Sequence, residues 1–479
     1  MKKVSIYELA KWSDGSIFLG DENAFVSNVG IDSRNIEKNA VFFAIKGENY
    51  DGHDFIFDAL TAGAEAVIAS DFAVLEREIK KYRQSDKNAS NIVQNSFINV
   101  ILVEDTKKAL GQIAQNYLRK LDIKVVAVTG SVGKTSVKDM IASVCSCKYY
   151  TAKTQGNFNN EIGLPLTILR MDEKTELAVL EMGMSHRGEI RELAEIAMPQ
   201  IGVVTNVGVS HIENLGSREA ICDEKLDIAS FFSQDCVLVL NGDDELLRKK
   251  AEEKRCRKVF ATISGEQGAK ADVIISHIES GGEIITFDVE SESESATVRL
   301  SRAGRHNALN AGLALAVGKE LGICLKDGAL ALANTKYQAR RLEFRHSKTG
   351  ITIIDDTYNA SPDSMKAALS VLSEKDGKRK IAVLADMLEM GTQSELYHSQ
   401  IGEYAAKLGL AMLFTYGNAA KYIAAAASKN DKNMEVFEFQ DKQELILQLE
   451  KIALPEDVIL VKGSNSMGMN EVSDAIANL

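Results

Sequence analysis

Residues 124–136 constrain the fold of this chain more than any other stretch of its sequence. Residues 125–129 are all apolar or β-branched and predict a buried strand. Gly130 ends that strand and opens the short pattern G-x-x-G-K-T, which runs into an expected helix. In such a turn the glycines let backbone N–H groups point inward, Lys134 supplies a mobile cation, and the Thr135 hydroxyl can hold Mg²⁺. The stretch therefore predicts a phosphate-binding turn in an α/β fold.

The spacing of this turn departs from the usual rule for phosphate loops. The pattern G-x-x-x-x-G-K-[ST] would need a glycine at position 128, where this chain has Val128. A glycine-rich turn between a strand and a helix can be purely structural, but the Lys-Thr pair after a buried strand favours a nucleotide. The residues expected to contact the phosphates of this nucleotide are Gly130, Ser131, Val132, Gly133, Lys134, Thr135 and Ser136.

Length and composition indicate a globular protein of about three domains. The chain has 479 residues, of which 45% are hydrophobic and 26% charged, so each domain can bury its own core. A net charge of -12 argues against a nucleic-acid partner, because such proteins usually carry a basic face. Since the N-terminus lacks a signal-peptide pattern and no run of about twenty apolar residues occurs, we expect a cytoplasmic protein without membrane insertion. The six cysteines lack zinc-binding spacing and are expected to be reduced.

Residues 1–105 form the first expected domain. An apolar strand at 40–45 is followed by a polar loop with two glycines and by a helix at roughly 54–63. Polar loops after buried strands often bind ligands in α/β folds, although Asp and Gly also favour turns that bind nothing. The sequence alone leaves both interpretations open for this loop.

Residues 106–335 form the second expected domain, which begins with a helix at about 106–120 and contains the phosphate turn. The run 154–161 is rich in side-chain amides, which hydrogen-bond phosphates, sugars or carboxylates without adding charge. Glu181 ends an apolar strand, and a carboxylate at a strand end beside a phosphate turn is suited to hold Mg²⁺.

Three further features of this domain are less specific. His211 follows the next strand, but histidine is an unusual ligand for Mg²⁺, and Lys225 has the pattern of a solvated helix lysine. Residues 257–302 alternate as short strands and predict a small β-rich excursion. Asn307 and Asn310 lie three residues apart and share a helix face, where they could contact a base or a ribose.

Residues 336–479 form the third expected domain. Strands are expected at 351–355, 380–385, 411–415, 434–438 and 457–462, with helices between them. This alternation predicts a Rossmann-like parallel sheet. No G-x-G-x-x-G follows its first strand, so a dinucleotide cofactor is not expected. Its polar signals are Arg341, and Asp356 and Lys462 at strand ends, where ligands bind in such sheets.

Seven motifs, in this order, resemble the Mur ligase family of ATP-dependent amide ligases. They are G-S-V-G-K-T-S, G-N-F-N-N-E-I-G-L-P-L-T, E-M-G-M-S-H-R-G-E-I, T-N-V-G-V-S-H-I-E, R-H-N-A-L-N-A, R-R-L-E and D-D-T-Y-N-A-S-P-D-S-M. In the first domain, D-S-R and G-E-N-Y-D-G-H-D-F are similar to the uridine-nucleotide-binding domain of that family. The resemblance covers nearly the whole chain and implies a UDP-sugar-binding domain, a central ATPase-like domain and a C-terminal Rossmann-like ligase domain.

The resemblance implies a reaction in peptidoglycan precursor synthesis, and the last motif is similar to the branch that adds D-alanyl-D-alanine. ATP, with Mg²⁺, would phosphorylate the terminal carboxylate of UDP-N-acetylmuramoyl-tripeptide, and the amine of D-alanyl-D-alanine would attack the acyl phosphate. Positioning and charge neutralisation would supply most of the catalysis. The implied protein is a monomer with these small molecules as partners, and two of its domains would close around one ATP.

The resemblance also implies roles for individual residues. The catalytic set would be Lys134, Glu181, His211, Lys225 and Arg341. The metal ligands would be Thr135, Glu181, His211 and Lys225, the last as a carbamate. Beyond the phosphate turn, ATP would contact Asn307, Asn310, Arg341 and Asp356. The other substrates would contact Ser33, Arg34, Lys46, Gly47, His53, Asn157, Asn159, Asn160 and Asn359.

A few positions depart from the family pattern. Ser361 and Asn465 stand where relatives commonly have asparagine and arginine, and Met184 replaces a residue that is usually smaller. The missing arginine leaves open how the third domain holds an anionic group, with Arg340 and Arg345 as possible substitutes. Two alternatives also stay open, namely a sister Mur or folylpolyglutamate-type ligase that adds another amine, and a nucleotide-dependent switch that only senses ATP.

Overall fold

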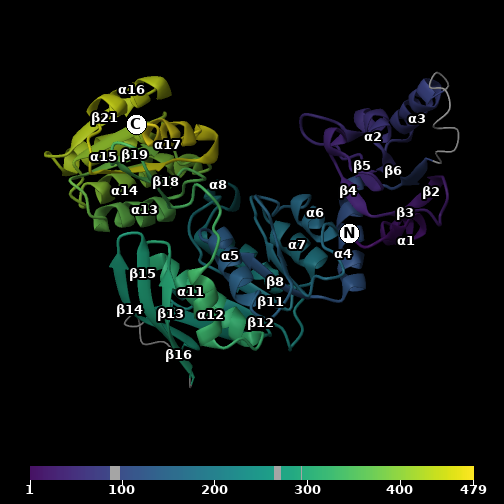
Figure 1. Cartoon of the computed structure of the whole chain (residues 1–479), viewed down its shortest axis with the longest axis horizontal. Helices are drawn as coiled ribbons and strands as arrows, with labels where there is room; N and C mark the ends of the chain where they lie inside the picture. Colours follow the sequence, from purple (N-terminus) through teal and green to yellow (C-terminus); the bar gives the residue numbers. More distant parts are fainter. Residues whose placement is uncertain (87–97, 264–270, 293) are drawn as a thin grey trace. The chain divides into compact units, whose positions relative to one another are not determined.

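The computed structural model describes residues 1–86, 98–263, 271–292 and 294–479. These residues divide into two compact units (Figure 1). The first unit comprises residues 1–127, 149–182 and 191–199, and the second comprises residues 128–148, 183–190 and 200–479. The expected central domain therefore contributes to both units, whereas the expected third domain lies wholly in the second.

The N-terminal part of the first unit is a mixed sheet covered by helices. Its strand order is β2-β7-β6-β5-β4, with β4 to β7 parallel and β2 antiparallel at one edge. The strands are β2 (Ser16–Leu19), β4 (Asn28–Gly30), β5 (Ala40–Phe43), β6 (Ala64–Ala69) and β7 (Asn99–Leu102), and a separate pair is β1 (Val4–Ser5) with β3 (Phe25–Val26). The helices are α1 (Ile6–Trp12), α2 (Ile56–Ala62) and α3 (Phe72–Asp86), with one-turn helices η1 (Ser33–Asn35) and η2 (Gly52–Phe55).

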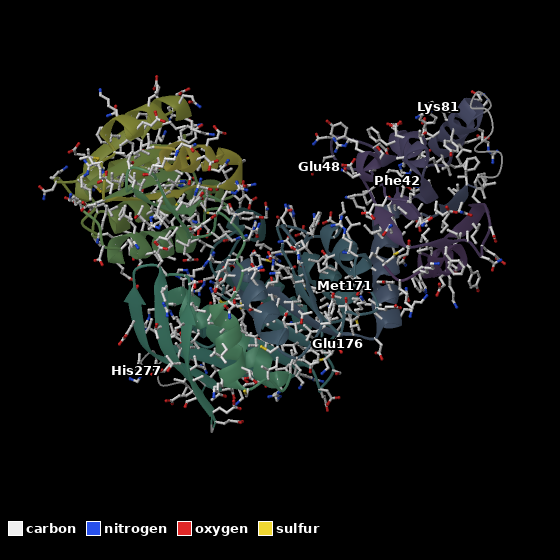
Figure 2. The ribbon with its side chains drawn as sticks, in the orientation of Figure 1. Phe42, Glu48, Lys81, Met171, Glu176 and His277 are labelled. Atoms are coloured by element: carbon white, nitrogen blue, oxygen red, sulfur yellow. The ribbon has the colours of Figure 1, made fainter. Side chains whose placement is uncertain are left out.

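Burial in this sheet follows its apolar strands. All four residues of β5 are buried, and Phe42 packs with Val67 of β6 and with Ile56 and Leu75 of the helices α2 and α3. The loop after β5 is exposed, as Figure 2 shows for Glu48. The predicted strand at 40–45 is thus confirmed, and the predicted helix at 54–63 corresponds to η2 and α2.

The rest of the first unit carries the amide-rich segment. Asp105 caps α4 (Thr106–Leu121) because its Oδ1 accepts hydrogen bonds from the N–H groups of Lys107 and Lys108, and this is the predicted helix at 106–120. Two parallel strands, β9 (Thr151–Lys153) and β10 (Leu177–Glu181), flank α6 (Gly163–Leu169) in the sequence. The predicted strand before the phosphate turn is β8 (Lys124–Thr129), which, like α7 (Glu189–Ala197), contributes residues to both units.

The central part of the second unit is a sheet with the order β16-β15-β14-β13-β12-β11. Its strands are β11 (Ile201–Val204), β12 (Val237–Asn241), β13 (Arg257–Ile263), β14 (Val273–Gly281), β15 (Ile284–Ser291) and β16 (Glu294–Leu300). The expected β-rich excursion at 257–302 in fact extends this sheet, since β13 pairs in parallel with β12 and with β14, and only the pairs β14–β15 and β15–β16 are antiparallel. The helices here are α5 (Lys134–Cys145), α8 (Ile212–Leu215), α9 (Arg218–Leu226), α10 (Glu245–Ala251), α11 (Arg305–Glu320) and α12 (Leu325–Ala333).

The C-terminal part of the second unit is the predicted Rossmann-like sheet. All five expected strands are present, as β18 (Thr352–Asp356), β19 (Arg379–Ala385), β20 (Met412–Tyr416), β21 (Glu435–Phe439) and β22 (Asp457–Lys462). The order is β17-β18-β22-β19-β20-β21, in which the unexpected β17 (Glu343–His346) pairs antiparallel with β18 at the edge. Sequence reasoning missed β17 because its residues are only partly buried and show no apolar run.

Helices cover both faces of this C-terminal sheet (Figure 1). Ala382 and Leu384 of β19 pack with α13 (Pro362–Glu374), α14 (Ser394–Ala405) and α15 (Ala420–Asn430). Ile381 and Val383 of the same strand pack with α16 (Lys442–Ile452) and α17 (Asn470–Ala477) on the other face. Because successive side chains of a strand point to opposite faces, a strand buried on both sides must be apolar throughout.

Two general expectations can be compared with the described part of the chain. None of its helices is long and apolar enough to cross a membrane. All six cysteines have free thiols, as expected, and burial raises the pKa of Cys145 and of Cys222 to about 12. These two thiols are therefore packed as small apolar groups, not poised for reaction.

Candidate active site

The phosphate turn has the geometry of an anion cradle. Gly133 adopts φ +87° at the N-terminal cap of α5, and no side chain caps that helix end. A helix N-terminus without a capping side chain is suited to bind an anion. Lys134 lies at the first helical position and its Nζ donates to the Gly130 carbonyl at 2.8 Å. Thr135 is buried in the same helical turn, so its hydroxyl is held close to the cradle.

The loop after β11 fixes the shape of this turn. Asn206 Oδ1 accepts hydrogen bonds from the N–H groups of Ser131 at 3.1 Å and Val132 at 2.9 Å. Thr205 Oγ1 donates to the Val132 carbonyl at 2.6 Å, and Gly208 N–H donates to Ser131 Oγ at 2.9 Å. The turn is therefore preorganised by side chains that lie about 75 residues away in the sequence.

Glycine is required at Gly130 for two separate reasons. Its φ of +151° lies in the region that other residues rarely adopt. A Cβ at this position would also lie 1.8 Å from Thr205 Oγ1. The backbone of the turn consequently runs in contact with the end of the neighbouring strand, which leaves no space for a side chain there.

In the first unit, Glu181 lies at the end of β10 within a polar network. Its backbone N–H donates to Thr154 Oγ1 at 2.9 Å, and its Oε1 accepts from Asn159 Nδ2 at 3.0 Å. The carboxylate is buried, with only 2% of the residue exposed. Asn160 Oδ1 accepts from Gly163 N–H and so fixes the start of α6, while Asn157 is exposed on the same loop. The amide-rich segment thus orients the carboxylate that was predicted to hold a metal.

Lys225 is fully buried in the second unit instead of being a solvated helix lysine. Its Nζ lies 3.8 Å from the sulfur of Met184, and 1% of the residue is exposed. Burial, with a smaller contribution from the positive charge of Lys134, lowers the pKa of Lys225 well below its ordinary value. The adjacent Glu224 does not pair with it, because its two carboxylate oxygens accept from the N–H groups of Gly188 and Ile190. Burial therefore favours the neutral amine form of Lys225 over the charged form.

His211 lies beyond β11 and faces a carboxylate of the C-terminal part of the same unit. Its Nδ1 is 2.5 Å from Glu389 Oε2, and the hydrogen bond with His211 lowers the pKa of Glu389. The imidazole is about one quarter exposed, at 23% of the side chain. His211 is therefore an oriented, partly accessible ring and not a loop histidine free to rotate.

The segment that carries Glu389 is anchored by a buried histidine. His398 Nε2 accepts from the Met387 N–H at 2.9 Å, and its Nδ1 donates to the Ser394 carbonyl at 2.7 Å. Burial lowers the pKa of His398, so the folded protein keeps this ring neutral. The unfolded chain takes up a proton as the pH falls below about 6.5, and folding stability must decline there.

We expect the change His398→Gln to reduce the loss of folding stability as the pH falls. The free energy of unfolding, measured by urea denaturation between pH 7 and pH 5, should fall less steeply in the variant because it lacks the imidazole. His277, which is exposed on β14 (Figure 2), provides the control. His277→Gln should retain the steeper fall, and an equally steep fall in His398→Gln would contradict the prediction.

The two asparagines of α11 contact each other, as their spacing predicted. Asn310 Nδ2 donates to Asn307 Oδ1 at 3.2 Å, and Asn307 Nδ2 donates to the Ala303 carbonyl at 2.7 Å. A Cβ on Gly133 would lie 3.1 Å from Asn310 Oδ1, so this asparagine borders the phosphate turn. The pair is in place to contact a nucleotide held by the cradle.

Arg341 and Asp356 belong to one cluster at the start of the C-terminal sheet. The Arg341 guanidinium carbon lies 3.9 Å from the ring centre of Tyr358. Asp356 accepts from Lys462 Nζ at 2.6 Å and from the Leu342 N–H at 3.0 Å. Lys462 is buried and also donates to the carbonyl of Asn359 at 2.8 Å. Asp356 and Lys462 therefore form an ion pair, while Arg341 stacks on Tyr358, two residues after Asp356.

The candidate uridine-binding residues of the first unit lie on two ordered loops. Asp32 caps η1, and Arg34 Nε and Nη2 each donate to its carboxylate at 2.8 Å. These bonds lower the pKa of Asp32 to about 2. Ser33 lies in the same helical turn, and the Arg34 side chain is 84% exposed. Both groups remain accessible to a ligand from solvent.

The second of these loops is closed by His53. Lys46 pairs with Asp51 as an isolated bridge, and Gly47 N–H donates to the Tyr50 carbonyl. His53 is buried, with its Nδ1 2.6 Å from Asp51 Oδ1 and its Nε2 accepting from the N–H of Ser70 at 3.0 Å. Both ring nitrogens are thus engaged within the protein, and the imidazole holds the shape of the loop.

The described residues contain no group of three or more His, Cys, Asp or Glu that could hold a metal ion alone. Mg²⁺ usually takes one or two carboxylates and completes its coordination with water and substrate phosphates. In the first unit, the buried and amide-oriented carboxylate of Glu181 has the chemistry to bind a metal that arrives with ATP. In the second unit, the hydroxyl of Thr135 has it too. They do not fit a metal that the protein keeps on its own.

Comparison with known proteins decides the family. Residues 25–118, 128–318 and 340–465 match the Mur ligase family catalytic domain, the Mur ligase middle domain and the Mur ligase glutamate ligase domain. A UDP-N-acetylmuramoyl-tripeptide--D-alanyl-D-alanine ligase of Bacillus subtilis is 38% identical, over 94% of this chain and 93% of its own. The enzyme of the same name from Escherichia coli is 32% identical, over 94% and 93%. The chain belongs to the Mur ligase family.

Solved structures agree with this family. MurF from Acinetobacter baumannii superimposes with a TM-score of 0.85 at 28% identity, covering 100% of this chain and 99% of its own. A MurF ligase from Thermotoga maritima, solved in complex with ADP, gives a TM-score of 0.80 at 29% identity over 94% and 97%. This Mur ligase therefore has the three-domain α/β architecture of MurF, as its sequence predicted.

Two departures from the family pattern can now be interpreted for this Mur ligase. Arg345, a possible substitute for the arginine missing at Asn465, donates to Asp474 at 2.7 Å and to Asp355 at 3.3 Å. Arg345 therefore connects β17 with β18 and α17, and the two carboxylates already neutralise its charge. Met184 covers the amine of Lys225 and contributes to its burial.

Sequence reasoning missed three contributors to the site of this Mur ligase. Thr205 and Asn206 shape the phosphate turn, and their signal was a polar pair directly after an apolar strand. Glu389 reaches His211 from a loop after β19 that shows no motif of its own, so only the folded structure reveals it.

Proposed function

We propose that this Mur ligase joins D-alanyl-D-alanine to UDP-N-acetylmuramoyl-tripeptide with hydrolysis of ATP to ADP and phosphate. The observation that carries the proposal is the agreement, over more than nine tenths of both chains, with relatives named for that reaction. The preorganised phosphate turn supports it, because the reaction must activate a carboxylate whose oxygen is a poor leaving group.

The proposed chemistry has two steps. The terminal carboxylate oxygen of the tripeptide attacks the γ-phosphorus of ATP, the bond to the bridging oxygen breaks, and ADP leaves. The amine of D-alanyl-D-alanine then attacks the acyl carbon through a tetrahedral intermediate, loses a proton, and expels inorganic phosphate as the amide forms. In both steps negative charge moves from one oxygen to another. Cations and N–H donors held in place by the protein therefore supply most of the stabilisation of the transition states.

The residues of the phosphate turn and of its surroundings have separate roles in this proposal. The N–H groups at the start of α5 hold the phosphates, and Lys134 exchanges its bond to the Gly130 carbonyl for the β and γ oxygens. Asn307 and Asn310 bind the adenosine, and Arg341 with Asp356 binds the nucleotide from the C-terminal domain. Asn157, Asn159, Asn160 and Asn359 provide uncharged donors and acceptors for the UDP-tripeptide.

We further propose that Mg²⁺ accompanies ATP, where it would neutralise phosphate charge. Glu181 and Thr135 would contribute oxygens to one ion, and His211 a nitrogen to a second. Lys225, whose pKa is lowered by burial, would take up CO₂ as a carbamate, which would add an anionic ligand. The protein is proposed to act in the cytoplasm, where its soluble nucleotide precursors are made, and as a monomer, as the family resemblance implies.

Phosphate release tests the proposed function directly. Purified protein would be incubated with ATP, Mg²⁺ and UDP-N-acetylmuramoyl-tripeptide, with D-alanyl-D-alanine, a single amino acid, or no acceptor. We expect release that depends on both the tripeptide and D-alanyl-D-alanine. Release with a single amino acid would identify a sister ligase, and ATP binding without any release would identify a nucleotide-sensing protein.

The change Glu181→Gln should weaken the dependence of ligation on Mg²⁺. Glutamine keeps the shape and the bond with Asn159 but removes the negative charge that attracts the ion. We expect the Mg²⁺ concentration for half-maximal rate to rise about tenfold or more. The matched control is Glu192→Gln on the exposed face of α7, which should titrate like the unchanged protein. An unchanged titration in Glu181→Gln would show that the metal is held elsewhere.

A further inference from the structure

His211 is held by a carboxylate that lies in a different domain. Glu389 Oε2 is 2.5 Å from His211 Nδ1, and Glu389 follows β19 in the C-terminal sheet, whereas His211 follows β11 in the central sheet. This close contact on one edge of the imidazole holds the direction of the ring.

Hydrogen bonds hold the segment that carries Glu389 in place. Leu388 N–H donates to Ser464 Oγ at 2.9 Å, and Met387 N–H donates to His398 Nε2 at 2.9 Å, so the two preceding residues are both anchored. Glu389 itself adopts φ +62°, a left-handed conformation that non-glycine residues seldom take. A surface glutamate that met a histidine by chance would not need a constrained backbone held at two points.

The histidine side of the contact is fixed as well. His211 also adopts φ +62°, at the N-terminal cap of α8. The loop leading to it is tied to the phosphate turn, because Gly208 N–H donates to Ser131 Oγ. On the other side, a Cβ at Gly391 would lie 3.1 Å from Glu213 Cγ, so the segment after Glu389 packs against α8.

We propose that Glu389 is a positioning residue that orients His211 for metal binding and that the C-terminal domain thereby completes this ligand. The inference rests on the proposed metal role of His211. It adds that His211 is a competent ligand only when the two domains are in contact, because the orienting carboxylate belongs to the other domain. An exposed ion pair without this role would leave metal binding unchanged when Glu389 is removed.

Binding of Mn²⁺, a spectroscopically visible substitute for Mg²⁺, provides a test that does not depend on turnover. Electron paramagnetic resonance would measure Mn²⁺ affinity of the full chain with a non-hydrolysable ATP analogue and UDP-N-acetylmuramoyl-tripeptide. We expect Glu389→Ala to weaken one Mn²⁺ site by about tenfold or more, as loss of an orienting partner usually does. Glu389→Gln, which keeps a hydrogen-bonding group but loses the charge, should lie between Glu389→Ala and the unchanged protein.

Three comparisons make the outcome decisive. Glu403→Ala, at an exposed position of α14, is the matched control and should bind Mn²⁺ normally. The double variant His211→Ala with Glu389→Ala should be no weaker than His211→Ala, since the carboxylate acts through the ring. If His211→Ala weakens Mn²⁺ binding but Glu389→Ala does not, this inference is wrong while the metal role stands. If His211→Ala itself binds Mn²⁺ normally, both fail, whatever the result of the phosphate-release test.

Discussion

Replacing Lys134 with alanine should reduce ligation by at least about a thousandfold while the protein stays folded. Lys134 is the cation of the phosphate turn, and its ammonium group is kept 2.8 Å from the Gly130 carbonyl, ready to move onto phosphate oxygens. The side chain is only partly buried, so thermal unfolding should shift by a few degrees at most.

Steady-state phosphate release and a thermal melt would measure the two parts of this prediction. The matched control is Lys249→Ala, which removes an exposed lysine of α10 and should leave both quantities unchanged. A Lys134→Ala protein that turns over within tenfold of the unchanged enzyme would refute the phosphate role.

Gly130→Ala should both destabilise the protein and abolish ATP binding. The added Cβ would lie 1.8 Å from Thr205 Oγ1, and the backbone at φ +151° would be strained with any side chain present. Strain and overpacking each cost roughly 1–3 kcal/mol. Thr205 would have to leave the Val132 carbonyl, so the turn would lose the shape that aims its N–H groups at phosphate. Urea denaturation and calorimetric titration with ATP would measure the two effects.

Gly63 offers a matched control that separates backbone strain from the steric clash. It has φ +107° at the end of α2, yet a Cβ there would have nothing within 4 Å. Gly63→Ala should therefore lower the free energy of unfolding only by the strain of a side chain at positive φ, about 1–2 kcal/mol. It should leave ATP affinity intact. Adding Thr205→Ala to Gly130→Ala should recover part of the stability by removing the clashing oxygen. Equal stability losses at the two glycines would mean that the neighbouring strand yields to the new side chain.

The strands of this protein were predictable because a parallel strand buried on both faces needs an unbroken apolar run. β5, β8, β10 and the inner strands β20 and β22 of the C-terminal sheet come closest to this condition, and all five expected strands of that sheet lie within one or two residues of the predicted bounds. The exception is β17, an edge strand with partly buried residues, whose pairing with β18 leaves no such pattern.

The local geometry of the candidate site was predictable where a short motif sets it. Spacing alone predicted the glycine turn and the shared helix face of Asn307 and Asn310, and their roles in binding stay predictions. Lys225 was misread from its local pattern as a solvated helix lysine, because burial of a helical lysine depends on what packs over it. Here that is Met184, which lies 41 residues away in the sequence.

The sequence by itself determined the elements, the phosphate turn and the family, because each depends on residues that are neighbours in the chain or on motifs kept in order. Tertiary structure alone decided which distant groups complete the site. Asn206 shapes a turn 75 residues earlier, Lys462 is bound by Asp356 at a separation of 106, and Glu389 meets His211 across two sheets. Such pairs follow from strand order and loop packing, and a pattern that spans a few residues contains no information about either.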